Sequence, residues 1–320
     1  MSKKLTMLTT IRGSLLEHFY PWGWDLERID RCCAMGLKRV TTRARHWDRD
    51  FKPVPVSDVA AMDRGMGDAI ADEIERTRRD GRKLAIILPV GPMGMYKQVI
   101  ARLKKSGTKA DHVHTFNMDE WSDTHGNTMP GDQPGGFEHA MTHALFAPLG
   151  RLTVPPNQRN FATQDNLPTY PQKIDALRKE GAKLVTVYGI GRACHIAFWE
   201  PQLAAKFSDG DWKRQTHRLG VALHPLTIEQ NALHSFNSRF TLIPCWANTI
   251  GPGLFLASDY CIGGADGAYP QRGAMWQGMS LCVTLQYGPS TWVPSSWMPT
   301  RPGRLFFLKV LGGPLEPEAH

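Results

Sequence analysis

The segment KLAIILPVGPMGMYKQVIARLKKSG, residues 83–107, carries the pattern on which the fold prediction rests. A run that is apolar throughout, KLAIILPV, is followed by a Gly–Pro turn at 91–92 and then by a stretch with apolar residues at helical spacing. A strand without polar alternation is typical of a parallel sheet that is covered on both faces. The segment therefore predicts a strand–turn–helix unit of an α/β domain.

The same pattern recurs along the chain. Strands are predicted in HVHTFNM and KLVTVYGI, and further candidate strands are RFTLIPCW, DYCIGG and RLFFLKVL. A helix is predicted from an N-cap at Ser57 to a stop at Gly81, and others in PGGFEHAMTHALFAPLG, YPQKIDALRKEGA and AYPQRGAMWQGMSLCVTL. We expect one doubly wound, mostly parallel (Rossmann-like) α/β domain with helices on both faces over residues 57–320. Residues 1–56 are expected to form an irregular N-terminal extension.

Composition narrows the class of protein. The chain has 320 residues and no apolar stretch of membrane-spanning length, and its N-terminus lacks a leader pattern, so we expect a cytoplasmic protein without membrane contact. Its six cysteines show no C-x-x-C pair, which indicates reduced thiols. The net charge of +8 invites a nucleic-acid partner, but Lys and Arg are scattered. We therefore expect no nucleic acid; an anionic small substrate, or no function at all, explains the charge as well.

Two strand ends carry side chains suited to acid–base chemistry. Asp119 and Glu120 close the strand HVHTFNM, and adjacent carboxylates repel, so one is expected either to be held by hydrogen bonds or to serve as a base. The structural alternative is a helix N-cap. In VYGIGRACHIAFWEP, residues 187–201, His195 and Glu200 follow a Gly-x-Gly turn. That position suits a catalytic histidine and a structural one about equally.

Metal and nucleotide cofactors are not expected. His112 and His114 point to one face of a strand, as two metal ligands would, but no third ligand stands at metal spacing. The GIG turn is not a dinucleotide fingerprint, because Cys194 stands where the last glycine belongs.

Four blocks of the chain resemble the glucosamine-6-phosphate deaminase/isomerase family, which shares a superfamily with the 6-phosphogluconolactonases. They are LPVGPMGMYK, FNMDE, HIAF-x-EP and NSRF at 237–240, in the family's order, and the resemblance covers about residues 57–310. It implies a cofactor-free mechanism in which Asp119 moves a proton between C2 and C1 of a sugar through an enediol-type intermediate. It also implies that His195 and Glu200 open the sugar ring, the glutamate fixing the tautomer of the histidine.

Three departures from the family pattern bear on activity. The family has Asp–Gly where this chain has Ala193–Cys194, so Glu200 alone would have to hold His195, or the substrate would have to arrive with its ring open. The family's Thr-Gly-Gly-Thr phosphate turn is replaced by a shorter loop without either hydroxyl. Gly267 stands about where the family has a lysine. We therefore expect that a 6-phosphate is not the handle by which the substrate is held.

Five residues are predicted to bind the substrate. Arg239 is the retained candidate for an anion partner, and Trp121 and Trp199 flank the predicted catalytic carboxylates, where indole faces could stack on a sugar ring. Packing in the core is the alternative for both tryptophans. The full set is Gly91, Glu120, Trp121, Trp199 and Arg239.

The leading hypothesis is a divergent sugar isomerase or deaminase that acts on an amino sugar or a related aldose or ketose. A sugar lactone hydrolase, with His195 activating water, is the second. A non-catalytic sugar-binding protein is the third, although a pure binder has no evident reason to keep Asp119, His195 and Glu200. The partner is expected to be a small sugar, and the resemblance implies a homo-oligomer.

Overall fold

A seven-stranded parallel sheet with the order β1-β10-β9-β6-β2-β3-β5 forms the centre of the molecule. The structure is a computed structural model and describes residues 6–269 and 274–317. The predicted doubly wound α/β fold is confirmed. The strands of this sheet are β1 (Phe51–Val56), β2 (Leu84–Leu88), β3 (Val113–Asn117), β5 (Arg159–Asn160), β6 (Lys183–Gly189), β9 (Tyr260–Ala265) and β10 (Gly303–Leu308).

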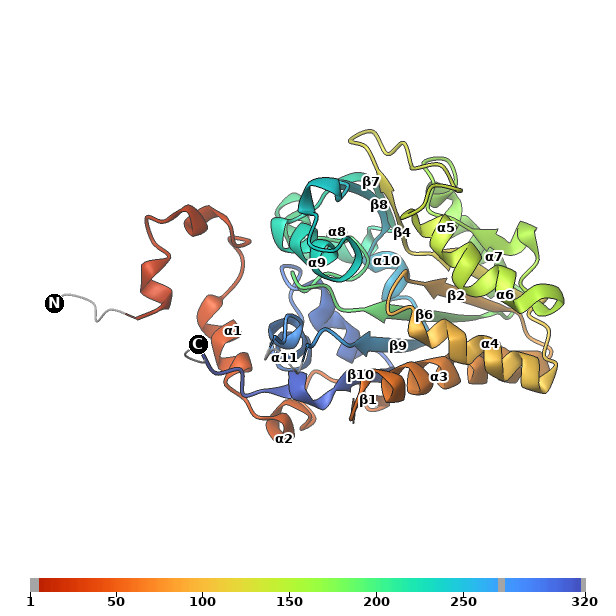
Figure 1. The fold of residues 1–320 in the computed structure, drawn as a ribbon, viewed down its shortest axis with the longest axis horizontal. Helices are drawn as coiled ribbons and strands as arrows, with labels where there is room; N and C mark the ends of the chain where they lie inside the picture. The colour runs from red at the N-terminus through yellow and green to blue at the C-terminus, as the bar shows by residue number, and fades with distance from the viewer. Residues whose placement is uncertain (1–5, 270–273, 318–320) are drawn as a thin grey trace.

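Helices cover the sheet on both faces. The long helices α3 and α4 lie side by side on one of them (Figure 1). The α-helices are α1 (Leu26–Cys33), α2 (Leu37–Val40), α3 (Val59–Arg79), α4 (Gly94–Ser106), α5 (Phe137–Met141), α6 (Ala147–Leu149), α7 (Tyr170–Lys179), α8 (Asp209–Arg214), α9 (Pro225–Ser235), α10 (Pro252–Phe255) and α11 (Gly278–Gln286). A π-helical turn, Thr142–Phe146, joins α5 to α6. No helix among the described residues is long and apolar enough to span a membrane.

The apolar strands are buried on both faces, as the sequence predicted. In β2, Leu84, Ile86 and Leu88 pack with residues of α3 and α4, while Ala85 and Ile87 point into the opposite cluster, which contains residues of α7 and α11. Successive side chains of a strand point to opposite faces, so a strand with helices on both sides is apolar at every position. This explains why KLAIILPV shows no alternation.

A second, smaller sheet lies beside the carboxyl ends of the central strands. Its order is β4-β8-β7, and both of its strand pairs are antiparallel. The strands are β4 (Asp119–Ser122), β7 (His217–Ala222) and β8 (Trp246–Ile250). The predicted strand RFTLIPCW is wrong, because this segment holds a 3-10 turn at Phe240–Leu242 and the strand begins only at Trp246.

The N-terminal segment belongs partly to the domain. Residues 51–56, predicted as the end of an irregular extension, form β1 and pair in parallel with β10. The prolines at 53 and 55 obscured this strand, and they are tolerated because β1 lies at the edge of the sheet. The N-cap of α3 is Asp58 rather than Ser57: the Asp58 side chain accepts a hydrogen bond from the Ala61 N–H at 2.8 Å. All six cysteines are free, and four of them are buried.

Candidate functional site

A cavity of about 340 Å³ lies at the carboxyl ends of β9, β6, β2 and β3, four neighbouring strands in the middle of the sheet. Its walls include the loops that follow β2 and β6. From β2 the chain moves outward through β3 to β5, and it then returns to β6 on the other side of β2. The strand order therefore reverses between β2 and β6, and the loops at such a switch point diverge to leave a crevice. The cavity lies at the edge of the sheet where the sequence analysis expected a site.

His195 lines this cavity and is oriented from behind by two side chains. Its Nδ1 lies 3.3 Å from Oε2 of Glu200 and 3.1 Å from the hydroxyl of Thr227, which projects from α9. Glu200 is fully buried, and its other oxygen accepts the backbone N–H of His224 at 3.3 Å. An ionised carboxylate only accepts hydrogen bonds, so this arrangement favours the tautomer with the proton on Nδ1. Nε2 is then left as an acceptor.

The turn after β6 is built around the imidazole. A Cβ on Gly191 would lie 1.9 Å from Nε2 of His195, so only glycine leaves room for the ring at this position. The turn is closed by a hydrogen bond from the Cys194 N–H to the Gly191 carbonyl, at 2.8 Å, and Cys194 itself has a φ of 59°. The GIGRACH segment thus places Nε2 against a backbone that lines the cavity.

Asp119, at the start of β4, lines the same cavity and is only 6% exposed. Its carboxylate has no hydrogen-bond partner among residues 6–269 and 274–317. Burial raises the pKa of Asp119 well above its usual value, and the neighbouring charge of Glu120 adds to this effect. A buried carboxylate without partners, with a raised pKa and facing a cavity, is suited to act as a base.

Glu120 has a different task from the one predicted. Its carboxylate accepts the backbone N–H groups of Trp121 at 2.9 Å, Phe137 at 2.9 Å and Glu138 at 2.8 Å. Phe137 and Glu138 open α5, so Glu120 satisfies donors that the helix itself leaves free. Glu120 is also absent from the described cavity wall, and its role in substrate binding stays a prediction.

The two predicted sugar-stacking tryptophans lie in the core. Trp121 packs against Phe137 and Phe198, with ring centroids 4.9 Å away in each case. Trp199 is fully buried and contacts Phe207 and Trp212. Neither indole lines the cavity, so the structure favours the packing alternative, and stacking on a sugar stays a prediction. Their positions beside Glu120 and Glu200 in the sequence do not carry over into space because side chains of neighbouring residues diverge.

Of the remaining predicted residues, Gly91 lines the cavity and Arg239 does not. Gly91 has a φ of 116°, a conformation that favours glycine. Arg239 is exposed on the turn that precedes Phe240, and its role as an anion partner stays a prediction. Ala193 is fully buried and also lies outside the cavity wall. Thr227, which no motif pointed to, supplies the second partner for His195 that the family pattern assigns to another residue.

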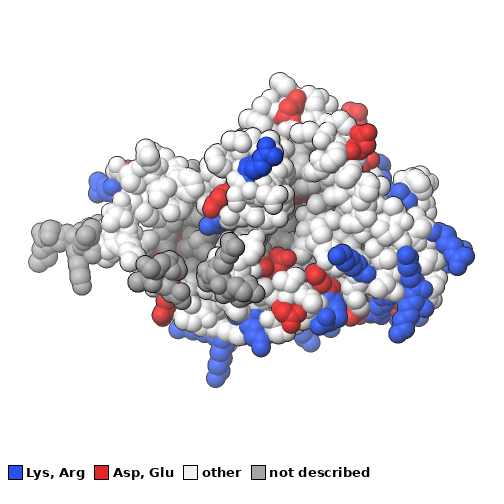
Figure 2. All heavy atoms as spheres, viewed as in Figure 1, with Lys and Arg blue, Asp and Glu red and all other residues white. Residues whose placement is uncertain are grey.

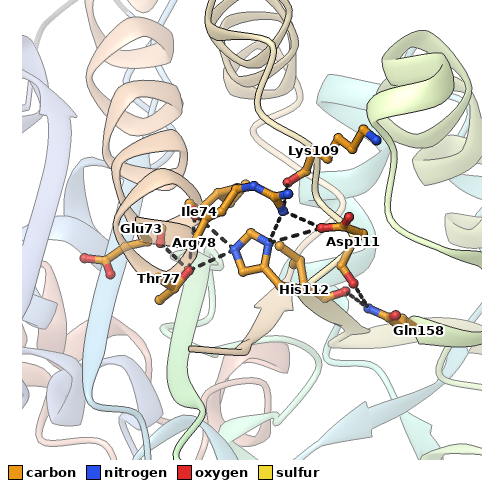
Figure 3. A network of polar contacts seen from close by, with 9 residues as sticks. Glu73, Ile74, Thr77, Arg78, Lys109, Asp111, His112 and Gln158 are labelled. Atoms are coloured by element: carbon orange, nitrogen blue, oxygen red, sulfur yellow. Dashed lines mark hydrogen bonds and ion pairs between the residues drawn. The ribbon is translucent and has the colours of Figure 1, made fainter. Parts of the chain in front are cut away.

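His112 is held by contacts within the fold. Figure 3 shows its ring between the end of α3 and the start of β3: Nε2 lies 3.0 Å from the Ile74 carbonyl and 3.1 Å from the Thr77 hydroxyl. Arg78 reaches over the ring to Asp111. Within residues 6–269 and 274–317, no group of three or more His, Cys, Asp and Glu side chains could hold a metal ion. This network is remote from the cavity, since it lies at the amino ends of the strands.

Comparisons with known proteins show which sequences this chain is similar to. The chain is 30% identical over 174 residues to a glucosamine-6-phosphate deaminase of Geobacillus, covering 53% of this chain and 61% of that one. It is 27% identical over 184 residues to the Caenorhabditis elegans glucosamine-6-phosphate deaminase, covering 57% and 63%. Over about half of its length, the chain is similar in sequence to glucosamine-6-phosphate deaminases. It matches less than two thirds of the length of these two relatives, and no family model matches it.

Two solved structures share the fold of this chain. A monomeric glucosamine-6-phosphate deaminase, described as a missing link of the NagB superfamily, aligns with a TM-score of 0.64 at 20% identity, over 80% of this chain and 96% of that one. The 6-phosphogluconolactonase of Thermotoga maritima aligns with a TM-score of 0.52 at 14% identity, over 81% and 99%. The common fold explains why the FNMDE and HIAF-x-EP blocks meet at one cavity.

Proposed function

We propose that this deaminase relative is a cofactor-independent enzyme that rearranges an amino sugar or a related aldose or ketose. The observation that carries the proposal is that Asp119 and His195 line the same cavity, each in a state suited to proton transfer. Asp119 is buried without a hydrogen-bond partner among the described residues, and His195 is oriented by Glu200 and Thr227. The names of the sequence relatives support sugar-phosphate chemistry of the deaminase kind.

The proposed reaction starts from the closed ring. Nε2 of His195, free to accept, takes the proton of the anomeric hydroxyl and delivers it to the ring oxygen as the C1–O5 bond breaks. Glu200 and Thr227 hold the ring of the histidine in the orientation that this transfer needs. The missing family aspartate therefore does not leave His195 with a single partner, because the Thr227 hydroxyl contacts the same nitrogen.

Asp119 acts on the open chain. Its carboxylate removes the proton from C2, the electron pair of that C–H bond forms the C1–C2 double bond, and O1 takes up a proton from water. The protonated carboxyl then returns its proton to C1 as the double bond moves to the heteroatom on C2, which releases its own proton to water. For an amino sugar this product is an imine, which water hydrolyses with release of ammonia. Burial helps because a raised pKa brings the carboxyl closer to the basicity that carbon acids require.

The test follows the proton. The protein is incubated in D₂O with amino sugars, aldoses, ketoses and lactones, each with and without a phosphate, and loss of the C2 proton is followed by NMR. We expect exchange and product with the wild type, and loss of both with Asp119→Asn. The second candidate, a lactone hydrolase, predicts that lactone opening survives Asp119→Asn but not His195→Gln. No turnover of any compound, with sugar binding retained, would replace both with the non-catalytic binding protein.

A further inference from the structure

The charged lining of the cavity is unusual for a relative of enzymes named after phosphorylated sugars. Among the described residues that form its wall, the carboxylates are Asp119 and Asp266, and neither Lys nor Arg is present. The basic residues lie elsewhere: on the face shown in Figure 2, Lys and Arg side chains are spread over the outer surface, with Asp and Glu among them. The overall charge of +8 therefore says nothing about the charge inside the cavity.

Asp266 follows β9 directly and lies at the end of the cavity where α4 begins, beside Met93 and Gly264. Asp266 is close enough to Asp63 of α3 to affect it electrostatically. Burial raises the pKa of the Asp63 carboxyl, and the charge of Asp266 raises it further. Asp63 in turn lies against the first residue of α4, because a Cβ on Gly94 would come within 1.9 Å of its Oδ2. The protein thus places its own carboxylate at a helix N-terminus, where a phosphate would otherwise find favourable N–H groups.

Groups that suit neutral hydroxyls line the same part of the cavity. Trp276 is half-buried and forms a wall with His234, their ring centroids 5.7 Å apart at 32°. The Asn231 amide donates to the Thr227 carbonyl at 2.9 Å, and its oxygen has no partner among the described residues. Gln277 is fixed by the Ile190 carbonyl and the Gly267 N–H. Carboxylate and amide oxygens beside an aromatic face match alternating hydroxyls and C–H groups of a sugar.

We propose that this end of the cavity binds the hydroxylated end of an unphosphorylated sugar, with Asp266 accepting hydrogen bonds from its hydroxyls and Trp276 packing against its C–H face. Asp266 is the specificity-determining residue, because its carboxylate repels a phosphate dianion in a site whose described wall residues include neither Lys nor Arg. The inference rests on the proposed function only in taking a sugar as the occupant. Trp276 takes the place that the sequence analysis assigned to Trp121 and Trp199.

The experiment measures binding without turnover. In the Asp119→Asn background, isothermal titration compares glucosamine with glucosamine 6-phosphate, and glucose with glucose 6-phosphate. We expect the unphosphorylated member of each pair to bind at least tenfold more tightly. Asp266→Asn keeps the shape of the side chain and removes the charge, so we expect this preference to fall about tenfold. Asp132→Asn, at an exposed residue outside the cavity wall, is the matched control and should leave the preference unchanged.

Three outcomes overturn the inference: tighter binding of the phosphorylated sugars by the parent, a preference that Asp266→Asn leaves unchanged, or no binding of either sugar. Failure of the proposed function looks different. There, the unphosphorylated sugar binds with the predicted dependence on Asp266, but the wild type neither exchanges its C2 proton nor releases product. Trp276→Ala gives an independent check, since it should weaken both members of each pair alike and leave the preference that Asp266 sets unchanged.

Discussion

The hydroxyl of Thr227 lies 3.1 Å from Nδ1 of His195, on the nitrogen that Glu200 also contacts. This pairing joins α9 to the turn after β6 and gives the histidine two partners from different parts of the chain. A partner that arrives from a distant helix can be gained or lost without any change in the HIAF-x-EP block. The orientation of His195 is therefore a tertiary property.

Replacing Thr227 tests this positioning role. Thr227→Val keeps the shape but removes the hydroxyl, so we expect kcat to fall about tenfold and the pH profile of kcat to shift, because the tautomer of His195 is less constrained. Thr227→Ser should restore both. Thr186→Val serves as the control, because it removes a buried hydroxyl of β6 that forms a hydrogen bond with Ser258 and does not contact His195. If it changes the pH profile as much as Thr227→Val does, Thr227 only supports the fold.

Gly191→Ala should be far more damaging than its small size suggests. The added methyl would lie 1.9 Å from Nε2 of His195, so the imidazole must move. Misplacing a reacting group by about 1 Å costs on the order of a hundredfold in rate, and we expect a loss of that size in kcat/KM. Gly210→Ala is the control, because its Cβ would meet only Arg214 at 3.5 Å. Equal effects of the two changes on kcat/KM would contradict the proposed contact.

Asp119→Asn should lower the activity of the protein and raise its thermal stability relative to the wild type. We expect kcat to fall by a factor of about 10² to 10⁴, the usual contribution of a general base. The pKa of Asp119 is raised in the folded state, so the folded protein binds more protons than the unfolded one between the usual carboxyl pKa and the raised value. The wild type therefore loses stability as the pH rises through that window, whereas Asp119→Asn should not. Thermal unfolding from pH 4 to pH 9 measures this: the Tm advantage of the variant should grow with pH.

The raised pKa of Asp119 also sets the pH at which activity should be lost on acidification. The base must be ionised, so we expect kcat of the wild type to decline as the pH falls through the raised pKa, at a higher pH than an exposed aspartate would give. A profile that stays flat down to the ordinary carboxyl range would argue against Asp119 as the base.

Trp199→Phe separates a core residue from a ligand contact. Trp199 is fully buried, and its Nε1 has no partner in the described chain, so we expect a loss of about 1–3 kcal/mol in the free energy of unfolding and no change in sugar affinity. Trp212→Phe is a close match, since that indole is equally buried and its Nε1 is equally without a partner among the described residues. Weaker sugar binding with Trp199→Phe alone would restore the role first predicted for it.

Local sequence was enough to predict the inner strands of the central sheet, and it placed Asp119 and His195 after strands whose carboxyl ends share one edge. Burial on both faces makes β2 and β6 apolar throughout, and parallel strands bring their carboxyl ends to one edge. Long-range packing decided the rest. Glu120 caps α5, which begins at Phe137, and Trp276 enters the cavity from beyond β9; neither relation leaves a periodic signal. Strand β1 was hidden because its prolines argue against a strand everywhere except at an edge.

Those prolines have a consequence for assembly. The outer edge of β1 would have to offer regularly spaced N–H and C=O groups for a second copy to continue the sheet, and Pro53 and Pro55 remove two of its donors. At the other edge, β5 comprises only Arg159 and Asn160. Both ends of the sheet are thus closed to strand addition, which protects the monomer from edge-to-edge aggregation. A homo-oligomer is therefore not expected to form by extension of this seven-stranded sheet.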